Sequence, residues 1–118
     1  MPKLDARYTA VGRRTNEQCR QAISEILMFE VSDERLRICT VTGVDVSPDK
    51  RSAKVFYTTE KDLYEQTDKC FEQAAGYIRK LLSQRLGHWR VVPALRFYVD
   101  PSVDLGEKIA GALEKEHI

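Results

Sequence analysis

Residues 72–82 read EQAAGYIRKLL and form the centre of the longest helical pattern in the chain. Apolar residues recur around this stretch at intervals of three and four, which is typical of a helix that packs one face on a core. Gly76 stands where a better helix former would fit, and an interior glycine costs about 1 kcal/mol relative to alanine. The reason for Gly76 decides whether this is an ordinary helix on a sheet or one that holds a ligand.

Two interpretations of Gly76 follow from the residues alone. Glycine could let the helix pack tightly against a sheet. Alternatively, the helix could bend at Ala75, so that the amides of its second half face a phosphate, as helix N-termini often do. Arg79 and Lys80 lie one turn further along and could meet the same phosphate. The apolar period continues through Ala75, so the pattern leaves both interpretations open.

The flanking sequence predicts an α+β domain. We expect a helix over 15–30 capped by Thr15 or Asn16, and a hairpin of strands over 36–47 and 52–59. Gly43 breaks the alternation of the first strand, which indicates a bulge. The long helix begins at Asp62 and ends at Gly87, and a strand over 94–99 returns to the sheet, which is therefore mixed, with helices on one face. A short amphipathic helix carries Leu105, Ile109 and Leu113.

Composition is that of one soluble domain. The chain has 118 residues, of which 42% are apolar and 31% charged, and these values suit a single modest core. The N-terminus has no apolar run after its early charges, and no window approaches the length of a membrane span. Three widely spaced cysteines, Cys19, Cys39 and Cys70, suggest buried hydrophobes in a reduced compartment. We expect a cytoplasmic protein without a metal site.

Charge is sorted along the chain although the net charge is only +1. Residues 77–99 carry five basic residues and no acidic one, whereas residues 60–72 carry five acids. A second basic cluster lies near the N-terminus. The fold could gather these cations on one face for an anionic partner, or they could be ordinary solvated side chains.

An enzyme is a poor match to the sequence. Asp33, Asp45 and Asp49 lie near turns, but we find no phosphate-binding glycine loop, nucleophile elbow or metal-ligand spacing around them. The sequence predicts no catalytic residue and no cofactor.

Three blocks in order resemble the bacterial ribosome-binding factor A family. Residues 14–36 (RTNEQCRQAISEILMFEVSDERL) resemble its first helix and D-x-R element, and residues 39–58 (CTVTGVDVSPDKRSAKVFYT) its hairpin. Residues 73–102 (QAAGYIRKLLSQRLGHWRVVPALRFYVDPS) resemble the most specific block. There Ala74-Ala75-Gly76 matches an A-x-G motif that replaces the GXXG loop with which KH domains clamp a nucleic-acid backbone.

The resemblance implies a type II KH-like domain over residues 13–116, preceded by a flexible arm over 1–12. It also implies a non-catalytic factor that binds the RNA of the small ribosomal subunit and assists late 30S assembly, rRNA processing and growth in the cold. We expect a monomer with no membrane or small-molecule partner. The termini carry little of the extra basic sequence that some relatives have, and the pI is only about 7.7, so we expect the central basic segment to carry more of the contact.

The expected RNA contacts combine the A-x-G motif with both basic clusters. They are Ala74, Ala75, Gly76, Arg79, Lys80, Arg85, Arg90, Arg13, Arg14 and Arg20. Tyr77 and Trp89 could stack on bases, although packing on the domain is the alternative for Trp89. A KH-like protein-interaction module without RNA contact is the alternative function, because a fold does not fix a function.

Overall fold

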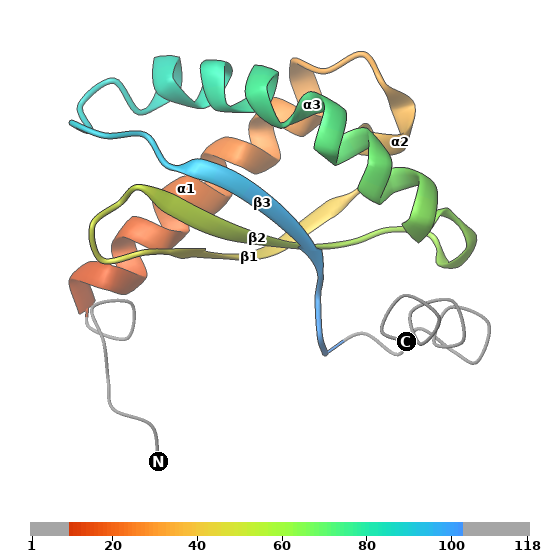
Figure 1. Ribbon diagram of the computed structural model, residues 1–118, viewed down its shortest axis with the longest axis horizontal. Helices are drawn as coiled ribbons and strands as arrows, with labels where there is room; N and C mark the ends of the chain where they lie inside the picture. Colours follow the sequence, from red (N-terminus) through yellow and green to blue (C-terminus); the bar gives the residue numbers. More distant parts are fainter. Residues whose placement is uncertain (1–9, 103–118) are drawn as a thin grey trace.

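The computed structural model describes residues 10–102 as two layers, one of helices and one of strands (Figure 1). The elements in chain order are α1 (Ala10–Phe29), α2 (Glu34–Arg37), β1 (Thr40–Val46), β2 (Ser52–Thr58), the short 3-10 helix η2 (Lys61–Leu63), α3 (Tyr64–Arg85) and β3 (Ala94–Val99). The amphipathic helix expected around Leu105, Ile109 and Leu113 lies outside the described residues, as do residues 1–9 of the expected arm.

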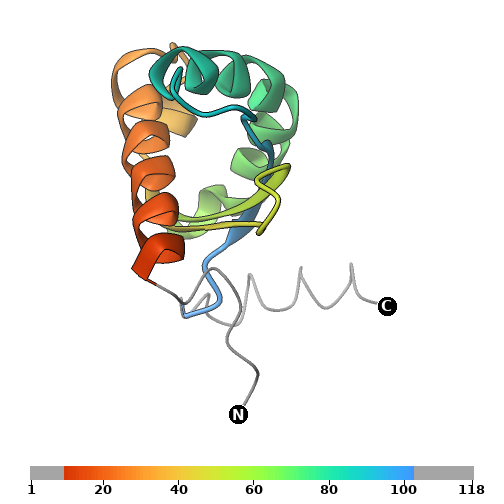
Figure 2. The ribbon, with the colours of Figure 1, turned by 90° about the vertical axis from the view of Figure 1, so that its left-hand side faces the viewer.

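The sheet has the mixed topology that the sequence predicts. Its order is β1-β2-β3, with β1 antiparallel and β3 parallel to β2. Among the described residues, α1 and α3 lie on the same side of the sheet (Figure 2). The pairing of β1 with β2 shifts between Val41 and Gly43, which confirms the predicted bulge.

Alternate residues of the strands form the floor of the core. In β2, Ala53, Val55 and Tyr57 are buried. Phe71 of α3 lies 4.8 Å from the ring of Tyr57 and stacks at 4.1 Å on Phe97 of β3. These rings fix α3 against the two strands, because aromatic pairs add to the free energy of burial.

The first helix begins earlier than predicted. It begins at Ala10 rather than Thr15, so residues 10–12 of the expected arm are helical. Asn16 is therefore an interior residue of the helix and not its cap, and its Oδ1 accepts a hydrogen bond from the backbone N–H of Val46 at 2.9 Å. The residue that looks like a cap therefore joins α1 to the sheet.

The prediction that the first strand begins at Leu36 is wrong. Asp33 accepts a hydrogen bond from the N–H of Arg35 at 3.0 Å and caps the short helix α2, which buries Leu36 in the core. The strand β1 then begins at Thr40. Periodicity cannot separate one helical turn from a strand end, because both place an apolar side chain on the core.

Helix α3 is continuous for 22 residues and does not divide at Ala75. Its axis curves near the middle, as Figures 1 and 2 both show. Its boundaries also differ from those predicted: the N-cap is Leu63 rather than Asp62, and the C-cap is Leu86 rather than Gly87. The N–H of Leu86 donates to the carbonyl of Leu82 at 2.8 Å, and Gly87 keeps a φ outside the left-handed region.

Candidate nucleic-acid interface

Gly76 lies on the exposed side of α3, away from the core. A Cβ atom added there would have no neighbouring atom within 4 Å. Tight packing of the helix on the sheet is therefore not the reason for glycine. Because α3 is unbroken, its interior amides bond to carbonyls within the helix, and the expected phosphate site on freed amides is also absent from α3.

What Gly76 does is leave space in a shallow hollow of about 530 Å³. The walls come from α3 and from the segment that leads into β3, and the lining residues are Gly76, Arg79, Lys80, Ser83, Arg90, Val91 and Val92. Three of these residues are basic and none is acidic. An anion that entered would meet cations on two walls.

Arg79 connects the two segments that form the first hollow, α3 and the segment before β3. Its Nη2 and Nε donate to the backbone carbonyl of Val92 at 2.9 and 3.3 Å. A guanidinium carries five N–H donors, so three remain available for a phosphate. The side chain thus positions the segment before β3 and keeps its positive charge at the surface.

A second hollow of about 550 Å³ adjoins the first. The two share Arg90 and Val91, and the remaining residues of the second are Arg14, Thr15, Gln18, Asp49, Lys50, His88 and Trp89. We call the two together the basic groove. Its lining contains five arginines and lysines and one carboxylate, so formal positive charge is concentrated there although the chain is nearly neutral.

The carboxylate in the groove is tied into the β1–β2 turn. Asp49 accepts a hydrogen bond from the Ser47 hydroxyl at 2.7 Å and one from the Arg51 N–H at 3.0 Å. These bonds lower the pKa of Asp49. Both bonds are accepted by the same oxygen, Oδ1, and they hold the turn that places Lys50 beside the groove.

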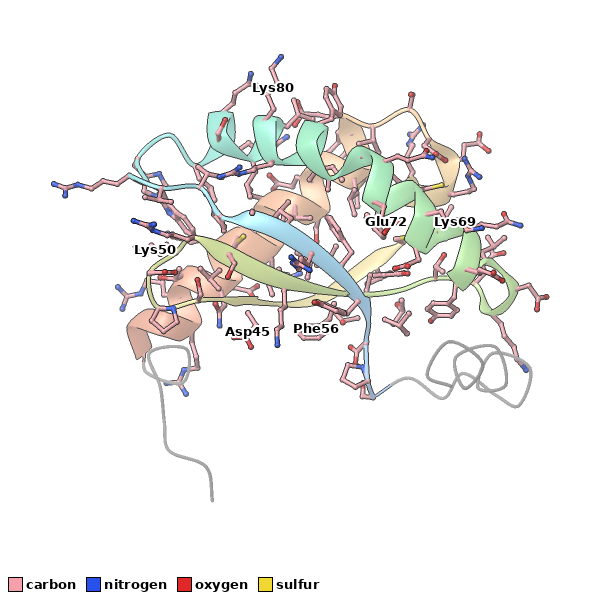
Figure 3. The ribbon with its side chains drawn as sticks, viewed as in Figure 1. Asp45, Lys50, Phe56, Lys69, Glu72 and Lys80 are labelled. Atoms are coloured by element: carbon pink, nitrogen blue, oxygen red, sulfur yellow. The ribbon has the colours of Figure 1, made fainter. Side chains whose placement is uncertain are left out.

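The structure brings half of the expected contacts together. Gly76, Arg79, Lys80, Arg90 and Arg14 all line the basic groove. Figure 3 shows Lys80 projecting from α3 away from the sheet, and Lys50 at the left edge of the molecule. Sequence spacing could not find Lys50, because only the hairpin turn brings it beside the segment before β3.

The other expected contacts lie outside the groove lining. Arg85 pairs with Glu25 of α1 and with Glu30, which directly follows α1, each at 2.6 Å. Arg20 pairs with Glu17 one turn away. Arg13 is exposed on α1. Ala74 and Ala75 are half-buried on α3, and Ala74 packs against the core.

Cys19, Cys39 and Asp33 each have a pKa that is shifted by their surroundings. Burial raises the pKa of the Cys19 thiol to about 12 and that of Cys39 to about 11, so both stay protonated. The hydrogen bond from Arg35 lowers the pKa of Asp33, which suits an ion pair rather than a general base. Between residues 10 and 102, no three His, Cys, Asp or Glu side chains form a potential metal site. No helix in that same range has the length and apolarity needed to span a membrane.

The chain is similar to known proteins of one family. Residues 12–113 match the family described as ribosome-binding factor A. The ribosome-binding factor A of Alkalilimnicola ehrlichii is 41% identical over 106 residues, covering 87% of this chain and 81% of the relative. That of Methylobacillus flagellatus is 40% identical over 103 residues, covering 86% and 81%.

Solved structures share the fold at lower identity. The crystal structure of ribosome-binding factor A from Thermus thermophilus aligns with a TM-score of 0.65 at 24% identity, over 74% of this chain and 93% of that one. Coordinates of the Thermus thermophilus factor fitted into a cryo-EM map of a 30S complex align with a TM-score of 0.61 at 23% identity, over 75% and 93%. The α+β, KH-like fold that the sequence predicts is confirmed, and the chain belongs to the ribosome-binding factor A family.

Proposed function

We propose that this chain binds the small ribosomal subunit through its 16S ribosomal RNA, and that it assists late assembly of the 30S subunit and processing of that RNA. The observation that carries the proposal is the basic groove, whose two hollows are lined by five cations, three of them in the hollow that Gly76 also lines. Membership of the family supports the choice of partner, as does the related Thermus thermophilus factor described in a 30S complex.

The action is binding rather than chemistry. Arg79, Lys80 and Arg90 neutralise phosphates beside Gly76, and Arg14 and Lys50 neutralise those that follow in the second hollow. The small residues Ala74, Ala75 and Gly76 let the RNA backbone approach α3. Arg13 is an outer contact, whereas Arg85 and Arg20 contribute less because carboxylates already pair with them.

A salt series tests the electrostatic part of this proposal. If about five phosphates are neutralised, log K for subunit binding falls against log[salt] with a slope of roughly −3.5 to −4.5. Lys80→Ala should make the slope shallower by about one. Co-sedimentation with purified small subunits at several salt concentrations measures it.

Lys69→Ala is the matched control, since it removes an exposed lysine from the other end of the same helix (Figure 3). The control should leave the slope unchanged. If Lys80→Ala also leaves it unchanged, the groove is not the RNA site. Binding that barely responds to salt would favour a protein partner held by apolar contacts.

The maturation role has a separate test in cells. Cells without the protein should accumulate unprocessed small-subunit RNA, more so in the cold, and the Lys80→Ala/Arg90→Ala variant should not restore processing. We expect the protein to act as a cytoplasmic monomer, without a cofactor or a small-molecule substrate. Normal RNA processing in the deleted strain at low temperature would reject this role.

A further inference from the structure

Trp89 gives the second hollow a flat aromatic surface that the electrostatic account does not use. We propose that this hollow holds one unpaired base of a single-stranded RNA, stacked on Trp89, and that Lys50 covers the ring until RNA displaces it. The proposal rests on the proposed function and adds the form of RNA and the residue that contacts its base.

The Trp89 ring is partly buried against the body of the domain. It packs against the hydrophobic core while still lining the second hollow. Its backbone N–H donates to the carbonyl of Leu86 at 2.8 Å, and the His88 ring meets it edge-on at 6.4 Å. A ring packed in this way loses little conformational entropy on stacking, which favours binding.

Lys50 shows that one face of the ring is accessible to a polar ligand. Its Nζ lies 5.2 Å from the centroid of the Trp89 ring. The β1–β2 turn sets this position, because Lys50 has a φ of 61° and its N–H donates to the carbonyl of Ser47 at 2.9 Å. The ammonium sits on a flexible four-carbon stem. It can therefore swing from the ring to a phosphate beside the incoming base and keep a favourable partner in both states.

The shape of the groove favours single-stranded RNA over an acidic peptide. Two hollows of nearly equal size meet at Arg90 and Val91, with basic side chains along both. A nucleotide chain supplies a repeating negative charge together with a flat ring for Trp89. An acidic peptide supplies only the charge. A duplex hides the faces of its bases in the stack, so only an unpaired base can reach the ring.

Trp89 is the single tryptophan of the chain, so its fluorescence reports directly on this site. The full chain is titrated with a single-stranded RNA oligonucleotide of about ten nucleotides, a duplex of equal charge, and polyglutamate. We expect saturable quenching with the single strand and little with the other two. Equal quenching by the duplex or by polyglutamate would overturn the proposal.

Affinities of labelled RNA for variants give the second measurement. Trp89→Leu keeps an apolar side chain for packing but removes the aromatic face, and it should weaken single-strand binding roughly 5- to 150-fold. Trp89→Phe should recover much of that loss. Tyr98→Leu is the matched control, because Tyr98 is 40% exposed on β3 and lines neither hollow. The affinity of this variant for the single-stranded RNA should equal that of the parent.

The two proposals fail in different ways. If Trp89→Leu binds oligonucleotide and small subunits as well as the parent does, base stacking is rejected while subunit binding stands. If the parent chain itself does not co-sediment with small subunits, the proposed function is rejected. Far-ultraviolet circular dichroism of Trp89→Leu and the behaviour of Trp89→Phe separate lost stacking from lost folding.

Discussion

Gly76 shows how one missing side chain shapes a binding surface. The glycine is helical and exposed, and a Cβ there would meet no atom within 4 Å. Neither backbone geometry nor core packing requires glycine at this position. The cost that it imposes on α3 is therefore explained best by the space that it leaves in the first hollow.

Gly76→Ala should separate stability from binding. We expect the free energy of unfolding to rise by about 0.5–1 kcal/mol, because alanine restricts the unfolded chain and suits a helix. RNA affinity should fall, because the new methyl group occupies part of the hollow. Urea unfolding and RNA titration measure the two effects, with Gln73→Ala as an exposed control on the same helix. A destabilised Gly76→Ala variant would show that packing does require glycine.

Individual residues also show how far the site could be predicted. Arg79, Lys80 and Arg90 lie in one basic segment, and the structure places all three in the groove. Arg85 belongs to the same segment, but Glu25 and Glu30 lie 60 and 55 residues away in sequence and pair with it only in the fold. Local charge predicts a basic surface, whereas tertiary partners decide which cations remain available.

At the scale of elements, Arg85 joins α3 to α1. Its guanidinium bonds to carboxylates of Glu25 and Glu30, and its side chain is 32% exposed. Because solvent screens such partly exposed pairs, Arg85→Ala should cost only about 0.5–1 kcal/mol of stability. The salt slope of RNA binding should stay unchanged in the same variant. A slope shallower by one would instead identify Arg85 as a phosphate contact.

The short helix α2 should make stability depend on acid pH. Arg35 lowers the pKa of its capping residue Asp33 below the ordinary value of 3.8, mainly through a side-chain hydrogen bond. A carboxyl with a lowered folded pKa contributes stability above its unfolded pKa and loses it as pH falls through the folded pKa.

Asp33→Asn keeps an acceptor for the N–H of Arg35 but removes this charge. The parent should be the more stable protein at pH 6, and its advantage should disappear as the pH falls below about 4. Urea midpoints measured between pH 6 and pH 3 give the comparison. A constant difference across that range would show that the ion pair does not stabilise α2.

The sequence predicts some elements well and others poorly, and the difference has a physical reason. Strands β2 and β3 alternate cleanly, and their parallel pairing follows from the helical crossover between them. The start of α1 and the turn of α2 were missed. Asp33 caps α2 locally, and Asn16, which looks like a cap in the sequence, bonds instead to Val46 of the sheet.

At the scale of the whole molecule, charge is separated rather than abundant. The net charge is +1, yet cations from α1, the β1–β2 turn, α3 and the segment before β3 converge on one groove. In Figure 3, Lys50 lies at the left edge of the molecule and Lys80 projects above its middle, whereas Glu72 and Lys69 lie to the right. Such a field orients an approaching polyanion toward the groove.

If one RNA strand occupies both hollows, cations from distant elements must act on the same ligand. Lys50→Ala and Lys80→Ala should each make the salt slope shallower by about one, and the double variant by about two, since counterion release counts phosphates. Lys80→Ala combined with Lys69→Ala should change the slope only as much as Lys80→Ala alone. Titrations with oligonucleotides of increasing length supply the remaining check, because a strand too short to reach from Lys80 to Lys50 should respond to only one of the two substitutions. If the slope of the double variant matches that of one single variant, the hollows bind separately, and a strand running along the whole groove is excluded.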